Sequence, residues 1–73
     1  MKTCRLMVSA RAYLGQPPAA VSRRHGFGMP ASFELTSGHR LDVTGKEFEE
    51  WRECVTERGE TVWIDERWVT HAE

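Results

Sequence analysis

The chain has 73 residues, of which 40% are hydrophobic and 29% are charged, and its formal net charge is −1. This length allows one domain with one small core, and the composition is that of a folded chain rather than a disordered one. No uncharged apolar run is long enough to span a bilayer and the first residues show no secretory pattern, so we expect a cytoplasmic protein that makes no membrane contact.

The charges are divided between the two halves of the chain. Residues 1–40 contain six Lys/Arg and one acidic residue, a net charge of +5. Residues 41–73 contain four Lys/Arg and ten acidic residues, a net charge of −6. A local patch of one sign attracts its opposite whatever the total charge. The division therefore indicates charged partners, and it does not bear on the fold.

Residues 3–14 alternate apolar and polar side chains, and this period of two predicts a β-strand. Several of the apolar residues also fit helical spacing, and Gly15 followed by two prolines would stop a helix. We favour the strand, because five apolar positions alternate without interruption from Leu6 to Leu14. Residues 15–30 contain three glycines and three prolines and predict a long loop.

Residues 31–43 predict a β-hairpin, because apolar and polar residues alternate on both sides of Ser37-Gly38. A two-residue loop would mix the two faces of this hairpin. A three-residue loop that ends at Gly38 sets Phe33 opposite Leu41 and keeps one face apolar. We therefore expect the second register.

Residues 45–58 predict an amphipathic helix. Thr44 and Glu47 form the S/T-x-x-E pattern of a capping box, and Gly59 suits the position after the last turn. The apolar positions that would pack against a sheet follow helical spacing: Phe48, Trp51 and Val55.

Residues 60–70 predict a second hairpin, closed at Asp65-Glu66. This closure pairs Val62 with Val69 and Trp63 with Trp68, which gives the hairpin two apolar faces. Together these elements predict an α+β fold: a single domain over residues 1–73, with a small antiparallel sheet of four or five strands and one helix packed on one face.

The expected helix carries a row of carboxylates, and we take these as the main candidate site: Glu49, Glu50, Glu53 and Glu57. Like charges four residues apart on a helix cost about 0.2–0.5 kcal/mol per pair. The simple interpretation is a solvated face. The functional hypothesis is that the row docks onto a basic protein surface.

The tryptophans of the second hairpin are the next candidates. The pairing that buries the valines turns Trp63 and Trp68 to the other face. Residues 4–14 or a homodimer contact would cover them in the simple interpretation. The alternative is an anchor for a partner, because aromatic residues are favoured at interfaces.

The basic half offers a competing function. Arg23 and Arg24 with Phe27 combine guanidinium groups and a stackable ring, the minimum for contact with single-stranded nucleic acid. Two adjacent arginines in a loop are also a common solvated feature.

The chain shows no motif of a known catalytic or metal site. Cys4 and Cys54 are fifty residues apart and are expected to be buried thiols, with a disulfide as the alternative in an oxidising compartment. The cysteines and histidines lack metal-ligand spacing, so we expect neither a metal nor a cofactor. An enzyme with a Cys/His site is the third candidate, after protein binding and nucleic-acid binding.

Three stretches, FELTSGHRLDV, TGKEFEEWRECVTERG and ETVWIDERWV, give residues 32–70 a predicted strand-strand-helix-strand-strand pattern. In this pattern the chain resembles small accessory proteins of phages and mobile elements, anti-CRISPR inhibitors among them. The resemblance covers just over half of the chain, and its motifs are structural. It implies a small non-enzymatic inhibitor or regulator that binds a host protein or protein complex, and it carries over no functional residue.

Overall fold

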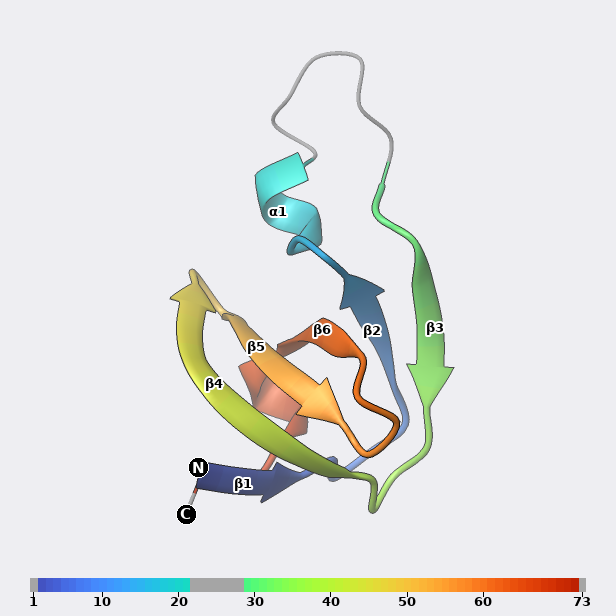
Figure 1. Ribbon diagram of the computed structural model, residues 1–73, viewed down its shortest axis with the longest axis vertical. Coiled ribbons are helices and arrows are strands. Elements are labelled where there is room, and N and C mark those ends of the chain that lie inside the picture. Colours follow the sequence, from blue (N-terminus) through green and yellow to red (C-terminus); the bar gives the residue numbers. More distant parts are fainter. Residues whose placement is uncertain (1, 22–28, 73) are drawn as a thin grey trace.

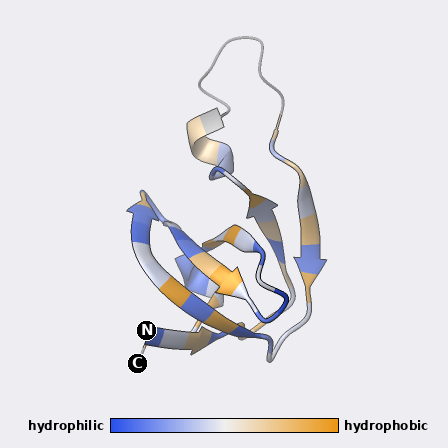
Figure 2. Cartoon of the chain, viewed as in Figure 1, coloured by the Kyte–Doolittle hydropathy of each residue, from blue (hydrophilic) through white to orange (hydrophobic). Residues whose placement is uncertain are grey.

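The computed structural model describes residues 2–21 and 29–72. Its elements in chain order are β1 (Lys2–Arg5), β2 (Ala10–Leu14), α1 (Pro18–Val21), β3 (Ser32–Leu35), β4 (Arg40–Phe48), β5 (Trp51–Thr56), β6 (Thr61–Asp65) and the 3₁₀ turn η1 (Glu66–Trp68). Alternating side chains recur along most of these segments, and Figure 2 shows the resulting change between hydrophobic and hydrophilic residues along the strands.

The six strands form one antiparallel sheet in the order β1-β4-β5-β6-β2-β3. β4, β5 and β6 are consecutive neighbours in the sheet and form a meander, in which β4 is strongly curved (Figure 1). After η1 the chain returns to the first strand, where Val69 bridges Leu6 and the Thr70 N–H donates to the Arg5 carbonyl at 2.9 Å. The first strand and the end of the described chain therefore lie side by side.

The expected α+β fold is wrong, because no helix packs on this sheet within the described residues. The helix predicted over residues 45–58 is the β4–β5 hairpin instead. α1 is a single turn of four residues inside the predicted loop, where the Ala20 N–H donates to the Pro17 carbonyl at 3.1 Å. The protein is a small, mainly β domain.

The backbone between Val43 and Phe48 explains why the capping pattern does not start a helix. Gly45 has a φ of 101°, and the β4–β5 pairing shifts register between Val43 and Glu47, which is the signature of a bulge. The Thr44 hydroxyl donates to the Glu53 carboxylate at 2.8 Å instead of capping a helix. Pairing with strands on both sides has overridden the local helical signal.

The two predicted hairpins also differ from the structure. The segments at 32–35 and 40–43 are strands, but Phe33 lies opposite Ala12 on β2, whereas Leu41 lies opposite Cys4 on β1. The connection between them is held by β1, since the Gly38 N–H donates to the Leu6 carbonyl at 2.7 Å.

The C-terminal hairpin is likewise replaced. Val62 pairs with Cys54 and Leu14, and the chain turns at η1 instead of returning along β6. Asp65 caps this turn by accepting from the Arg67 N–H at 2.9 Å. Trp63 and Trp68 are therefore not cross-strand partners.

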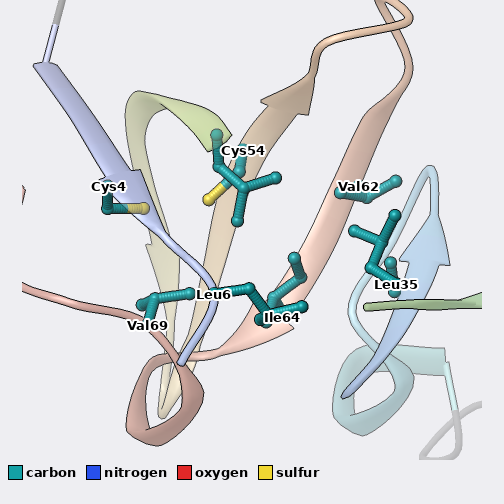
Figure 3. Close-up of a cluster of buried hydrophobic side chains, with 9 residues drawn as sticks. Cys4, Leu6, Leu35, Cys54, Val62, Ile64 and Val69 are labelled. Carbon is teal, nitrogen blue, oxygen red and sulfur yellow. The ribbon is translucent and has the colours of Figure 1, made fainter. Parts of the chain in front are cut away.

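The core consists of inward-facing side chains from all six strands, part of which Figure 3 shows. Its buried members are Cys4, Leu6, Ala12, Leu35, Leu41, Cys54, Val62, Ile64 and Val69. Fully burying a side chain such as Leu41 or Ile64 stabilises the fold by about 1.5–3 kcal/mol. One continuous core serves every strand, so the chain forms a single domain.

The described residues contain no helix with the length and hydrophobicity needed to cross a membrane.

A glycine substitution at Glu49 distinguishes the hairpin from the predicted helix. Glu49 has a φ of 53°, in the left-handed region that costs residues with a Cβ about 1 kcal/mol. Glu49→Gly should therefore raise the free energy of unfolding by about 0.5–1 kcal/mol in a urea titration, and Glu49→Asn should act in the same direction. Glycine inside a helix would lower it by about 1 kcal/mol.

The neighbouring residue provides the control for this test. Glu50 lies in the same turn without a positive φ, so Glu50→Gly should not stabilise the protein. A loss of stability in Glu49→Gly as large as that in Glu50→Gly would contradict the turn.

Candidate functional site

The four carboxylates expected on one helix face lie in separate places. Glu49 and Glu50 form the turn between β4 and β5, Glu53 lies on β5, and Glu57 follows the end of β5. A strand advances about 3.3 Å per residue, so Glu49 and Glu57 lie at opposite ends of β5. Glu57 instead accepts a hydrogen bond from the Arg40 N–H at 3.2 Å. The predicted row is therefore divided, and only part of it remains together.

The part that remains is an acidic tip, formed by the exposed residues Glu47, Glu49 and Glu50. Arg52 lies 3.5 Å from the Glu47 carboxylate and 3.2 Å from that of Glu66. The Glu50 carbonyl accepts from the Glu66 N–H at 2.8 Å, which ties the tip to η1. One guanidinium shared between two carboxylates leaves this end of the sheet negatively charged.

An aromatic face lies beside the acidic tip, formed by the half-buried residues Tyr13, Phe48 and Trp51. The rings of Tyr13 and Trp51 meet edge to face, with centroids 5.5 Å apart and planes at 87°. Phe48 is the cross-strand partner of Trp51. Tyr13 comes from β2 and Trp51 from β5, so their rings meet across β6, which lies between these strands.

Trp63 forms the buried base of the aromatic face. Its cross-strand partners are Tyr13 on β2 and Glu53 on β5, so the strand pairing places it on the same outward side. The indole is only 7% exposed, and its N–H donates to the Gly15 carbonyl at 3.2 Å. Trp63 therefore supports the face and presents little surface of its own.

Trp68 lies apart from Trp63, on η1, and is 38% exposed. The guanidinium carbon of Arg67 lies 4.9 Å from the centroid of its ring, within the range of a cation–π contact. The same guanidinium binds both carboxylate oxygens of Asp65, at 3.1 and 2.8 Å. These hydrogen bonds hold the pKa of the Asp65 carboxyl below its ordinary value.

The residues proposed for nucleic-acid binding, Arg23, Arg24 and Phe27, lie outside the described residues. Other arginines of the basic half are placed by the sheet. Arg5 on β1 lies directly opposite Arg40 on β4. Arg11 lies on β2 opposite Glu34.

The two cysteines are buried and free, and Figure 3 shows their sulfur atoms directed toward each other. Burial raises the pKa of the Cys54 thiol to about 12 and also raises the pKa of Cys4. A thiol in this state supplies no nucleophile at neutral pH. Among residues 2–21 and 29–72, no group of three or more His, Cys, Asp or Glu side chains could hold a metal ion.

Sequence reasoning did not select Tyr13 as a site residue. Tyr13 stands on the polar side of the alternation in residues 3–14, where an aromatic residue is a signal of an outward apolar contact. Its partner could not be identified from that pattern, because Trp51 is 38 residues away and was assigned to the packed face of a helix.

No protein-family model, curated protein or solved structure matches this chain. Its function must therefore be inferred from the chemistry of its own surfaces.

The buried thiols give a test of this core. At a pKa of about 12 almost none of the Cys54 side chain is thiolate at pH 8, so native protein should react with iodoacetamide at least about 100-fold more slowly than protein in urea. Cys4→Ser, which leaves Cys54 alone, should behave in the same way when followed by mass spectrometry. Modification of native Cys4→Ser at the rate of the unfolded chain would contradict this placement.

The Asp65–Arg67 contact predicts a specific pH dependence. Because the folded pKa of Asp65 is lowered from 3.8, its contribution to stability is fully present above that value and is lost as the pH falls through the folded pKa. Asp65→Asn should therefore lower the urea midpoint at pH 6, and the difference from the unmodified protein should shrink as the pH falls below 3.8. If the difference in urea midpoint stays constant down to pH 2, the charge of Asp65 does not contribute to stability.

Proposed function

We propose that this protein is a small non-enzymatic binding module that holds a basic segment of a partner protein on its aromatic face, beside the acidic tip. The observation that carries the proposal is the half-exposed Tyr13–Trp51 pair, which adjoins a turn of exposed carboxylates. Tyr and Trp are favoured binding residues, and both rings attract Arg and Lys side chains through cation–π contacts.

The charges around the rings favour a cationic occupant. Glu53 lies on the outward side of β5, two residues from Trp51 and opposite Trp63. Glu49 and Glu50 end the same hairpin beyond Phe48. A basic side chain over the rings would therefore meet carboxylates at the margin of the face, whereas an acidic partner would be repelled.

Rigidity also supports this assignment. The rings stand on paired strands, and the edge-to-face contact and the Trp63 hydrogen bond hold them together before any partner binds. Side chains that are already ordered lose less conformational entropy on binding. The aromatic face is thus a preformed surface.

An inhibitory or regulatory role fits a module of this kind. A domain of this size can occupy a basic surface of a host protein or complex and so keep nucleic acid from it. The helix of the predicted strand-strand-helix-strand-strand pattern is replaced by the β4–β5 hairpin. The resemblance to anti-CRISPR inhibitors therefore gives no support to this role, which we infer from the aromatic face and the acidic tip.

Calorimetric titration with a synthetic Arg-Gly repeat peptide tests the proposal. Glu50→Gln removes a carboxylate of the acidic tip and leaves its carbonyl bond to Glu66 in place, so affinity should fall about fivefold, or about 1 kcal/mol. Trp51→Phe keeps a ring for packing but weakens the cation–π contact, and should lower affinity by a similar factor. Binding should also weaken as the salt concentration is raised.

Glu57→Gln is the matched control, since Glu57 is also an exposed carboxylate but lies at the other end of β5. It should bind the peptide as the unmodified protein does. Equal loss of affinity in Glu57→Gln and Glu50→Gln would reject a localised site, and equal binding of a Glu-Gly repeat peptide would reject the charge argument.

A further inference from the structure

A second surface, distant from the acidic tip along β4, contains two opposed arginines. Arg5 and Arg40 are direct partners across β1 and β4. The next pair, Leu6 and His39, is hydrogen-bonded through the Leu6 N–H at 3.0 Å. Arg5 and Arg40 therefore occupy the alternate, non-hydrogen-bonded position, where facing side chains are closest. Like charges directly opposite one another destabilise a sheet, so this pair needs an explanation.

No carboxylate of the described residues forms an ion pair with either of these two guanidinium groups. The ion pairs among residues 2–21 and 29–72 involve Arg52 and Arg67 only. The Arg5 guanidinium donates to the Gly38 carbonyl at 3.2 Å. Glu57 meets Arg40 through the backbone N–H. Both side chains can therefore still bind an anion.

A cavity of about 390 Å³ lies at this pair, lined by Thr3, Cys4, Arg5, Arg40, Thr70 and His71. The Thr70 hydroxyl oxygen accepts from the Arg5 N–H at 2.9 Å, so the hydroxyl hydrogen can donate to a ligand. The Thr3 side chain is a second hydroxyl in the lining. Asp42 and Glu57 border Arg40 on the side of β5, which confines an anion to the side of β1.

An exposed tryptophan, Trp68, lies two residues before Thr70 and outside the lining of this cavity. The Trp68 carbonyl accepts from the Met7 N–H at 2.8 Å, so Trp68 follows directly along the strand from the Arg5–Thr70 contact. The Met7–Trp68 and Arg5–Thr70 hydrogen bonds flank the Leu6–Val69 bridge, so Trp68 and Thr70 stand on either side of the buried Val69, opposite Met7 and Arg5. Guanidinium and hydroxyl donors beside a stackable ring are the combination that single-stranded nucleic acids require.

We propose that this surface binds single-stranded nucleic acid, with a backbone phosphate held by Arg5, Arg40 and the Thr70 hydroxyl and a base stacked on Trp68. The site uses none of the residues of the aromatic face. A phosphate-bearing peptide would use the guanidinium groups but would not require the indole, and for this reason a nucleic acid fits the surface better.

Fluorescence anisotropy of a labelled oligothymidylate, titrated with the full chain at low salt, tests the proposal. Arg40→Gln should weaken binding about tenfold and make the slope of log K against log salt concentration shallower by about 0.7, the value for one phosphate contact on a single strand. Trp68→Ala should weaken binding about fivefold or more while leaving that slope unchanged. Arg5→Gln is a second variant for the phosphate contact.

Arg11→Gln is the matched control, because Arg11 is also exposed on a strand but faces Glu34 at the other side of the sheet. It should bind as the unmodified protein does, and circular dichroism should show that every variant is folded. Binding that persists unchanged in both Arg40→Gln and Trp68→Ala would overturn the assignment, as would a lack of binding at low salt.

Competition distinguishes the possible sources of phosphate. Inorganic phosphate and a phosphoserine peptide should displace the oligonucleotide only at concentrations at least about 100-fold higher than unlabelled oligothymidylate. Displacement by the phosphopeptide at equal concentration, with no effect of Trp68→Ala, would show an anion site for phosphorylated protein and overturn the nucleic-acid proposal. The Arg-Gly peptide should still bind Arg40→Gln, so the two proposals can fail independently.

Discussion

The double pairing of β4, with β1 on one side and β5 on the other, is the constraint on which the rest of the structure depends. Leu41 is fully buried between Cys4 on β1 and Thr56 on β5. Its burial holds the start of β4 between β1 and β5, and the bulge after Val43 lets the strand continue along β5 with a shifted register. A helix over residues 45–58 would replace β5, the strand that pairs with both β4 and β6, and would remove Cys54 from the core.

The alternation of side chains along these paired strands also separates the core from the two charged surfaces. β4 begins at Arg40, beside Arg5, and ends next to the acidic tip at Glu47. Seven residues of strand span at most about 23 Å, and the bulge and the curvature of β4 shorten this distance. The two surfaces lie toward opposite ends of one strand, and each contains charges of both signs, because Asp42 and Glu57 border Arg40 and Arg52 lies beside Glu47.

Local patterns predicted extended structure in parts of five strands but not their partners, and the single strand expected over residues 3–14 is two strands, Lys2–Arg5 and Ala10–Leu14, with different partners. The alternation around Phe33 and Leu41 correctly indicates two strands. Nothing in residues 31–43 shows, however, that β3 pairs with β2 and β4 with β1, and that the two strands do not pair with each other. Pairings between distant segments depend on the whole set of strands, and several registers of a short alternating segment keep one apolar face.

The helix prediction failed for a related reason. Residues 45–58 satisfy a helical pattern, but the side chains from Trp51 to Thr56 include β-branched and aromatic types that pack well in strands. The capping pattern at Thr44 is a local signal worth about 1 kcal/mol, which is small against the burial of Leu41 and Ile64. The grouping of the acidic residues depends on the turn at Glu49 and could not be inferred from an expected helix.

The two charged surfaces lower the stability of the folded protein. A domain of this size buries a small core and has a narrow margin of stability. The opposed Arg5–Arg40 pair and the clustered carboxylates of the acidic tip each reduce that margin, and neither contributes to the core. A ligand that binds only the folded state and neutralises such a cluster removes the repulsion and adds its own binding free energy. The charges clustered at the two ends of β4 are therefore not required by the core, and they are the groups on which the two proposed binding surfaces rest.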